Sequence, residues 1–228
     1  MQCFRKIRSF VRRSDRVTKR QSEALKNLWP IYGLDNIKYS FDPDVIFDKC
    51  QPIILEIGFG NGDSLCKQAL CFPEKNFLGV EVHKPGLGSV LHKASCYDVK
   101  NLKVIDGDVV EIISQIGDDP FLYGVQIYFP DPWPKKKHHK RRLIQLPFIE
   151  DLSKCVCSNG FCHLVTDWDP YADWIDSVFS ISDSWQKGIA NPHQSEWLEK
   201  RSITRFEERG IKLGNKISEF LFTCVRSN

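Results

Sequence analysis

The sequence predicts an α/β fold with a mainly parallel sheet and helices on both faces. Between residues 53 and 179, short apolar runs typical of buried strands alternate five times with segments typical of helices. A glycine-rich turn, Gly58–Gly62, follows the first strand, and the fourth strand ends at Pro130. Alternating strands and helices form βαβ units, whose strands are parallel. The 228 residues suffice for one domain of generous size with an appendage.

The chain before the first strand divides into a basic arm and a connecting loop. Residues 1–30 hold nine Lys or Arg and two acids, and within them we expect a helix from Asp15 to Leu28. The segment Tyr32–Gln51 is rich in Asp and Pro, which favours a loop. We therefore expect an arm over residues 1–30, helical or partly disordered, and a single domain over residues 31–228.

Five strands and five helices follow from the alternation. The expected strands are Ile53–Ile57, Phe77–Val82, Leu102–Ile105, Val125–Phe129 and Phe161–Val165. The expected helices are Asp63–Cys71, Pro85–Tyr97, Val109–Gln115, Leu143–Cys157 and Tyr171–Phe179. The turn residues Ser158-Asn159-Gly160 should end the fourth helix. Two further strands are expected near Ile203–Glu208 and Ile217–Val225.

The net charge of +3 conceals an uneven distribution of charge. The arm carries a net charge of +7 and residues 135–142 carry +6, whereas the rest of the chain carries −10. Two basic segments on an acidic body favour a polyanionic partner that binds at a defined place. A solvated arm and a solvated charged loop are the alternatives, because a basic run alone is a weak signal.

Nine cysteines are scattered along the chain without a C-x-x-C pair or a zinc-finger spacing, so we expect no metal site. Residues 1–20 contain no apolar core of a secretory signal. No apolar run approaches the ~20 residues that span a bilayer. We expect reduced cysteines, mostly small core residues, in a cytoplasmic protein.

The glycine-rich turn differs from the dinucleotide fingerprint G-x-G-x-x-G. Gly58 and Gly60 fit this fingerprint, but Asp63 occupies the third glycine position, which makes a pyrophosphate cradle less favoured. The acid Glu56, just before the turn, suits a ligand with a positive charge. S-adenosyl-L-methionine has an ammonium and a sulfonium group and no phosphate, so it meets both requirements.

Two more acids end successive strands. Glu81 ends the second strand, where a carboxylate can accept hydrogen bonds from ribose hydroxyls. Asp108 follows the third strand and could reach an adenine amino group. A single acid is most often a surface residue. Three acids around one glycine turn, at the edge where open α/β sheets bind ligands, indicate a cofactor site.

A stiff corner with an acid and a tryptophan follows the fourth strand. It reads Phe129-Pro130-Asp131-Pro132-Trp133-Pro134 and leads into the basic run of residues 135–142. Its prolines favour a stiffened loop over the start of a helix. The cations suit phosphates, the Asp131 carboxylate suits the N–H groups of a base, and Trp133 suits either stacking on RNA or anchoring in the core.

Asp167 ends the fifth strand and faces the same edge of the sheet. Its alternative role is a helix N-cap, although Asp169 fits that cap better because Pro170 would occupy the first helical position. His138 and His139 have no acid or Cys at ligand spacing, which favours contact with RNA or solvent over metal binding.

These motifs together resemble the bacterial tRNA (guanine-N7-)-methyltransferase family, one of the class I S-adenosyl-L-methionine-dependent methyltransferases, over roughly residues 20–226. The glycine turn marks only the superfamily, whereas the corner with its basic tail is specific. The other segments that carry the resemblance are Gly79-Val80-Glu81-Val82, Thr166-Asp167-Trp168-Asp169-Pro170-Tyr171 and Thr204-Arg205-Phe206-Glu207-Glu208-Arg209-Gly210.

The resemblance implies a Rossmann-like seven-stranded sheet with one antiparallel strand. It also implies methyl transfer from S-adenosyl-L-methionine to N7 of guanosine 46 in the tRNA variable loop. The implied cofactor contacts are Glu56, Glu81, Asp108 and Asp131, beside Gly58 and Gly60 of the turn. The implied substrate contacts are Lys135, Asp167, Thr204, Arg205, Phe206 and Glu207. The implied tRNA contacts are Lys137, His138, His139, Lys140, Arg141 and Arg142. Arg205 stands where Lys is expected in many relatives.

Guanine N7 has a free lone pair, so this reaction needs N7 in line with the methyl group rather than a strong general base. Asp131 is the candidate catalytic residue, and it could hold the guanine edge, hold the cofactor or stabilise the developing positive charge. A Rossmann oxidoreductase, an RNA-binding protein with a degenerate methyltransferase fold, and a methyltransferase for another RNA or base are the alternatives. The missing third glycine disfavours the first, and the retained Glu56, Glu81 and Asp131 disfavour the second.

Overall fold

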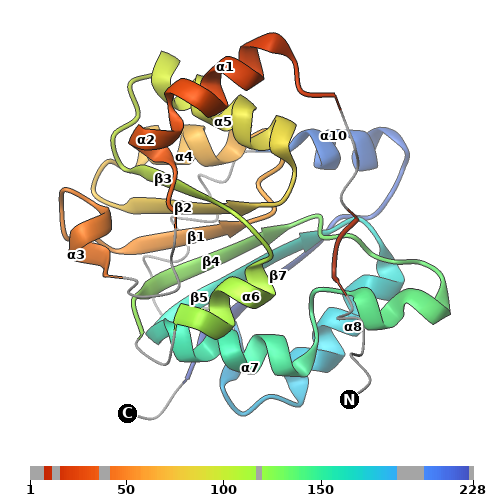
Figure 1. The fold of residues 1–228 in the computed structure, drawn as a ribbon. Helices are drawn as coiled ribbons and strands as arrows, with labels where there is room; N and C mark the ends of the chain where they lie inside the picture. Colours follow the sequence, from red (N-terminus) through yellow and green to blue (C-terminus); the bar gives the residue numbers. More distant parts are fainter. Residues whose placement is uncertain (1–7, 12–15, 36–41, 117–119, 189–202, 226–228) are drawn as a thin grey trace, which may run out of the picture.

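A seven-stranded sheet forms the centre of the structure (Figure 1). The computed structural model describes residues 8–11, 16–35, 42–116, 120–188 and 203–225. The strands are β1 Ile53–Ile57, β2 Asn76–Glu81, β3 Leu102–Asp106, β4 Leu122–Tyr128, β5 Val156–Thr166, β6 Trp185–Lys187 and β7 Ser218–Cys224. Their spatial order is β3-β2-β1-β4-β5-β7-β6. Strands β1 to β5 are parallel and β7 runs antiparallel to both of its neighbours, which confirms the expected sheet.

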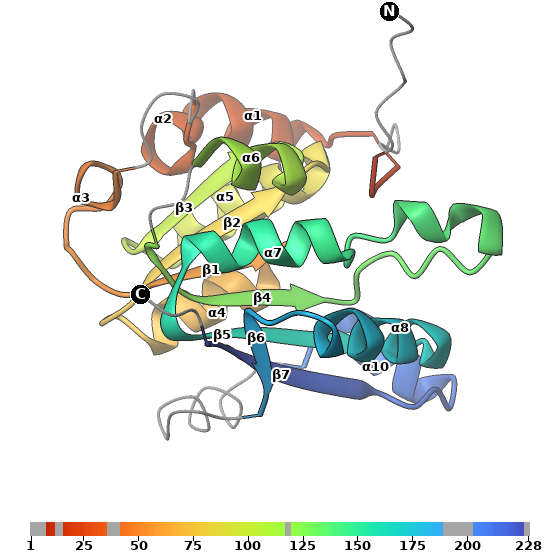
Figure 2. The same cartoon turned by 90° about the horizontal axis from the view of Figure 1, so that it is seen from below.

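Helices cover both faces of this sheet (Figure 2). They are α1 Lys19–Asn27, α2 Trp29–Tyr32, α3 Pro43–Ile46, α4 Asp63–Cys71, α5 Lys84–Cys96, α6 Val109–Ile116, the 3-10 helix η2 Lys136–Arg141, α7 Leu146–Cys155, α8 Asp169–Ser180 and α10 Arg205–Lys212. Helices α6, α7 and α8 contribute to the hydrophobic cluster on one face. Helices α1, α2, α4 and α5 contribute to the cluster on the other. The expected α/β class is therefore confirmed.

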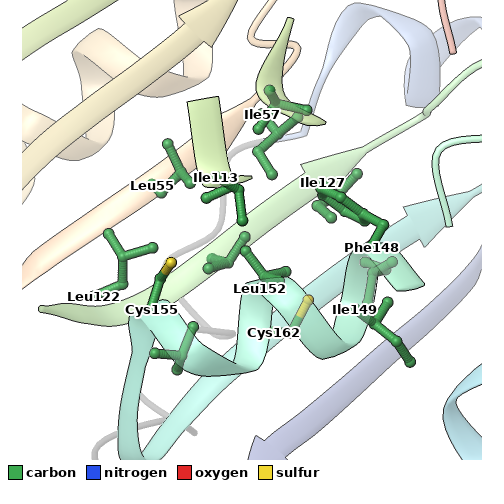
Figure 3. Packing of buried hydrophobic residues seen from close by; sticks show 14 of the residues in the cluster. Leu55, Ile57, Ile113, Leu122, Ile127, Phe148, Ile149, Leu152, Cys155 and Cys162 are labelled. Atoms are coloured by element: carbon green, nitrogen blue, oxygen red, sulfur yellow. The ribbon is translucent and has the colours of Figure 1, made fainter. Parts of the chain in front are cut away.

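Strand β1 supplies both hydrophobic clusters. Leu55 and Ile57 pack toward α6 and α7 with Ile113 and Leu152 (Figure 3). Ile54 belongs to the cluster on the opposite face, because successive strand residues alternate between faces. All five residues of β1 are buried, as expected for a central parallel strand covered on both sides.

The N-terminal helix is shorter than the sequence predicted. It begins at Lys19, because Thr18 accepts a hydrogen bond from the Gln21 backbone while the Gln21 side chain accepts from Thr18, a capping box. The predicted start at Asp15 lies outside the described residues. The predicted loop over Tyr32–Gln51 contains the short helix α3, and the short helix α2 ends at its first residue. Both have proline in the first turn, where its missing N–H costs nothing.

The predicted stop of the fourth helix at residues 158–160 is wrong. Helix α7 ends at Cys155 and the chain enters β5 directly. Val156 pairs with Leu122 and Phe161 pairs with Gly124, so the intervening residues of β5 form a bulge. Asn159 there has φ of 63°, a left-handed conformation that Asn tolerates better than most residues do. The turn-forming residues therefore bend a strand instead of ending a helix.

Two other predictions about local structure are wrong. The segment expected as a strand near Ile203–Glu208 enters helix α10, because Thr204 and Glu207 form a capping box. The basic run expected as a loop contains the 3-10 helix η2. The sequence also gave no signal for the short strand β6.

We expect Gly62→Ala to destabilise the protein more than Gly214→Ala. Gly62 and Gly214 have similar left-handed φ angles of 72° and 76°, so alanine at either position costs about 1–2 kcal/mol in backbone strain. A Cβ on Gly62 would also collide with Val90, whereas a Cβ on Gly214 meets nothing within 4 Å. Overpacking should add about 1–3 kcal/mol at Gly62 alone. Urea unfolding of both variants measures the difference, and equal losses would contradict it.

Candidate functional site

A pocket of about 360 Å³ opens at the carboxyl ends of β1, β2 and β4. This is the edge where open α/β sheets bind ligands, and the volume is within the range of small-molecule sites. Residues from the glycine turn, the strand ends and the acidic corner line it, together with a short N-terminal segment. The lining includes Ser9, Phe10, Val11, Gly58, Gly60, Glu81, His83, Asp108, Tyr128, Phe129, Asp131 and Phe206. Predicted site residues from five separate segments thus meet at one pocket.

The glycine turn after β1 depends on left-handed backbone. Gly58, Gly60 and Gly62 have φ of 72°, 57° and 72°. A Cβ on Gly58 or Gly60 would meet no atom within 4 Å, so conformation rather than space within the protein requires glycine there. The two residues line the pocket, where the absence of side chains lets a ligand approach the backbone.

Glu81 connects the end of β2 to this turn. Its Oε2 accepts a hydrogen bond from the Gly60 N–H at 2.9 Å, and its Oε1 accepts from the N–H groups of Val82 and His83 at 2.7 and 3.0 Å. Burial raises the pKa of Glu81, although the three backbone N–H groups oppose the shift. A carboxylate offers about four acceptor positions, so Glu81 retains capacity for a ligand hydroxyl.

Glu56, predicted as a cofactor contact, is buried near the end of β1. Its side chain is only 3% exposed, and it is absent from the described residues that line the pocket. Burial, and then the nearby charge of Glu81, raise the pKa of Glu56 to about 8. Its Oε2 has no hydrogen-bond partner within the described part of the chain. Burial therefore favours the neutral form of this carboxyl, and its predicted contact with the cofactor stays a prediction.

Asp108 lines the pocket at the end of the third strand. Its Oδ1 accepts a hydrogen bond from the Val110 N–H at 3.1 Å, and its backbone carbonyl accepts from Glu111 and Ile112. The residue thereby caps the first turn of α6. The position agrees with the expected place of an acid beside the second and third strands.

The corner around Asp131 is held in an uncommon conformation. Phe129 and Trp133, which flank Pro130-Asp131-Pro132, have φ of 52° and 45°. Left-handed backbone at bulky residues costs about 1–3 kcal/mol each and concentrates at functional sites. Asp131 is exposed and lines the pocket, which places its carboxylate at the pocket mouth.

The basic run divides into exposed and internal cations. Lys135, Lys137 and Lys140 are exposed, whereas His138, His139 and Arg141 are partly buried. Partial burial, and then the surrounding cations, lower the pKa of His138, so the neutral ring is favoured. The exposed lysines leave their charges open to solvent.

Arg142 differs from the rest of the run because it is only 3% exposed. Its Nε donates to the Pro132 carbonyl at 3.0 Å, and its guanidinium lies 5.0 Å from the ring centroid of Tyr171 and 5.4 Å from that of Trp174. The expectation of a direct tRNA contact does not agree with this burial. Arg142 holds the acidic corner against α8.

Helix α10 brings a second set of predicted residues to the pocket. The Phe206 ring stacks with Phe129 at a centroid distance of 6.3 Å and is 61% exposed. Arg205 Nε lies 3.3 Å from a carboxylate oxygen of Asp63 at the start of α4. Thr204 and Glu207 form the capping box that begins the helix. Of these four residues, Phe206 lines the pocket and Arg205 connects α10 to the helix that follows the glycine turn.

Asp167 lies beside α10 rather than capping α8. Its Oδ2 accepts a hydrogen bond from the Asn215 side chain at 3.1 Å, and a Cβ on Gly210 would lie 3.1 Å from the same oxygen. The expected N-cap at Asp169 is wrong, because Trp168 occupies that position and Asp169 begins the helix. Both candidate caps thus leave the α8 terminus without a side-chain cap.

Trp133 contacts the chain's own N-terminal segment. Its Nε1 donates to the Ser9 carbonyl at 2.9 Å, and Arg141 donates to the carbonyls of Arg8 and Phe10. Neither of the roles weighed for Trp133 from the sequence includes this contact. The pairing joins segments more than 120 residues apart, and no local pattern could have revealed it.

The cysteines contribute little to this site. Of the eight in the described residues, all free, Cys66, Cys155, Cys162 and Cys224 are buried, so half rather than most are core residues. Among the same residues, no group of three or more His, Cys, Asp or Glu is arranged to hold a metal ion. No helix in the described ranges is long and apolar enough to cross a membrane.

Comparisons with known proteins give a consistent assignment. The family model Methyltransf_4, with the description "Putative methyltransferase", matches residues 50–220. The tRNA (guanine-N(7)-)-methyltransferase of Nitrosococcus oceani is 44% identical over 96% of this chain and 91% of its own. The enzyme of the same name from Aeromonas hydrophila is 41% identical over 97% and 94%. Among solved structures, the 16S rRNA methyltransferase KamB has a TM-score of 0.56 at 12% identity and covers 83% of this chain and 95% of its own, which supports the fold alone.

We expect the buried Glu56 to make stability fall as pH rises. Its pKa is about 8 in the folded protein and 4.5 ordinarily, so between these values the unfolded chain has lost the proton that the folded protein keeps. Folding is then disfavoured progressively from pH 5 to pH 8. The stability of Glu56→Gln relative to wild type should therefore increase by about 2–3 kcal/mol over that range.

Urea unfolding at pH 5 and pH 8 measures this change. The same substitution at the exposed Glu23 is the matched control, because it removes a carboxylate without removing a buried group. An equal stability difference at both pH values would show that Glu56 is not buried as a neutral acid.

Proposed function

The chain belongs to the tRNA (guanine-N(7)-)-methyltransferase family, and we propose that it transfers the methyl group of S-adenosyl-L-methionine to N7 of a guanine in the tRNA variable loop. The observation that carries the proposal is the near full-length similarity to relatives with that name at 41–44% identity. In this proposal, residues 31–228 form the methyltransferase domain and residues 1–30 a basic arm. The protein would act in the cytoplasm.

The lining of the pocket fits S-adenosyl-L-methionine in its chemistry. Glu81 has acceptor capacity for the ribose hydroxyls, and Asp108 lies where it can accept from the adenine amino group. Gly58 and Gly60 leave the backbone open to the amino acid part of the ligand. Glu56 is kept as a proposed cofactor contact, buried in β1 two residues before Gly58. Bound there, S-adenosyl-L-methionine supplies an electrophilic methyl group on a sulfonium.

The guanine would enter between the acidic corner and α10. Asp131 and Phe206 both line the pocket, with Phe129 stacked against Phe206, so an aromatic surface stands beside a carboxylate. Lys135 and Arg205 are the exposed cations closest in sequence to these two residues. They suit the phosphates on either side of the guanine, and Asp167 with Thr204 and Glu207 fixes the position of α10.

The tRNA backbone would lie along η2. Lys137 and Lys140 are exposed there, beside the partly buried His138 and His139, and phosphate contacts dominate affinity for nucleic acids. Arg142, which is buried, contributes by holding the corner rather than by touching RNA. Arg141 is partly buried, so its exposure is intermediate between that of the exposed lysines and that of Arg142.

The proposed reaction requires positioning and charge stabilisation. Guanine N7 attacks with its own lone pair, so no residue removes a proton before methyl transfer. The purine becomes positively charged as the bond forms. A carboxylate that lines the pocket next to the strained corner would stabilise that charge if the guanine binds beside it. Asp131 is therefore the proposed catalytic residue.

Two tRNA transcripts that differ only at the variable-loop guanine test the function. With labelled S-adenosyl-L-methionine, we expect methyl incorporation into the transcript with guanine and none into the transcript with adenine there. Borohydride reduction and aniline cleavage should break the product at that nucleotide, as the lability of 7-methylguanosine requires. Equal labelling of both transcripts would favour the alternative of another base.

We expect Asp131→Asn to slow methyl transfer without unfolding the protein. The substitution keeps the size of the side chain and removes its charge, so the single-turnover rate at saturating cofactor and tRNA should fall by about 10²–10³. Folding should survive because Asp131 is exposed. Asp169→Asn, at the exposed start of α8, is the matched control. A folded Asp131→Asn variant with the wild-type rate would leave only loop geometry as the role of Asp131.

A further inference from the structure

The short segment of residues 8–11, here called the strap, lies against the acidic corner and the end of η2 (Figure 1). Ser9, Phe10 and Val11 from the strap line the pocket that we assign to the cofactor. The strap therefore forms part of the wall that a bound ligand would touch. None of the sequence motifs that carry the family resemblance includes these residues.

Three N–H donors, from two residues more than 120 positions later in the sequence, bind three consecutive backbone carbonyls of the strap. The Trp133 Nε1–H donates to the Ser9 carbonyl at 2.9 Å. The Arg141 guanidinium donates from Nε to the Arg8 carbonyl at 3.2 Å and from Nη2 to the Phe10 carbonyl at 3.0 Å. One fixed fork thus spans the carbonyls on both sides of the carbonyl that Trp133 holds.

The two donor residues also hold each other. The Arg141 guanidinium carbon lies 4.0 Å from the centroid of the Trp133 ring, close enough for a cation–π contact. Trp133 is itself in a strained left-handed conformation with φ of 45°, and its indole N–H reaches the strap. A planar, always charged group with several fixed donors is required here, and lysine lacks that geometry.

We propose that Trp133 and Arg141 are positioning residues for the cofactor, which act by holding the strap against the pocket. This inference rests on the proposed function, because it assigns the pocket to S-adenosyl-L-methionine. It divides the basic run into two tasks. The exposed Lys137 and Lys140 meet phosphates, whereas Arg141 uses two of its N–H donors on the chain's own backbone.

Cofactor binding in the absence of tRNA separates this role from RNA contact. In calorimetry with the full chain, Arg141→Lys and Trp133→Phe should each weaken binding of S-adenosyl-L-methionine by about tenfold, because the strap is held for a smaller fraction of the time. Arg141→Lys keeps the charge that a phosphate needs and loses the fork. Lys136→Gln, on the exposed face of η2, is the control and should bind as wild type does.

Cleavage by trypsin after Arg8 gives a second readout that is independent of affinity. The Arg8 carbonyl belongs to the scissile bond and accepts from Arg141. S-adenosyl-L-methionine should therefore slow this cleavage in wild type and Lys136→Gln but not in Arg141→Lys or Trp133→Phe. Thermal unfolding establishes that each variant is folded. If one of the two variants does not fold, the other alone is sufficient to test the inference.

Wild-type affinity and wild-type protection in both variants would overturn the inference and leave the proposed function intact. Failure of the wild-type protein to bind S-adenosyl-L-methionine would overturn the proposed function, and the inference with it.

Discussion

The Glu81 carboxylate fixes the edge of the sheet on which the whole site is built. It accepts one hydrogen bond from the turn after β1 and two from the chain after β2. The bond from Gly60 connects the turn after β1 to Glu81, 21 residues away in the sequence, and holds this left-handed glycine in place. Burying a carboxylate is unfavourable, and three charge-assisted bonds offset that cost. The pocket wall therefore exists before any ligand binds, which reduces the ordering that binding must bring about.

A row of buried polar side chains lies beneath this edge. Glu56, Gln126 and His163 are register partners on the adjacent strands β1, β4 and β5. His163 lies between the Tyr128 hydroxyl at 3.0 Å and a Glu219 carboxylate oxygen at 2.7 Å. Neither amide atom of Gln126 has a hydrogen-bond partner within the described residues. Buried polar groups without hydrogen-bond partners destabilise a core. Their occurrence next to the pocket agrees with the tendency of functional sites to retain buried polar groups that a core otherwise excludes.

The sequence predicted the elements whose signals are local. Strand β1 and helix α4 have the predicted bounds, because an apolar run and the glycine turn define them. The wrong predictions concern residues whose partners are distant in the sequence, or motifs that can form more than one local structure. A capping box turned an expected strand into α10, and a bulge absorbed Ser158-Asn159-Gly160. At the site, Glu81 and Asp108 line one pocket as their strand-end positions predicted, but burial of Glu56 and Arg142 depends on packing that no spacing rule contains.

The buried Glu56 also changes how a pH profile of this enzyme should be interpreted. Methyl transfer to guanine N7 requires no general base. A rate that changes near pH 8 would ordinarily be attributed to a general base, and here that interpretation would be mistaken. Glu56 titrates there because burial raises its pKa to about 8. Its ionisation would place a negative charge beneath the glycine turn, next to Glu81, and disturb the pocket wall rather than the chemical step. A profile with this midpoint in cofactor affinity, and none in the single-turnover rate, is the pattern that a structural carboxyl produces.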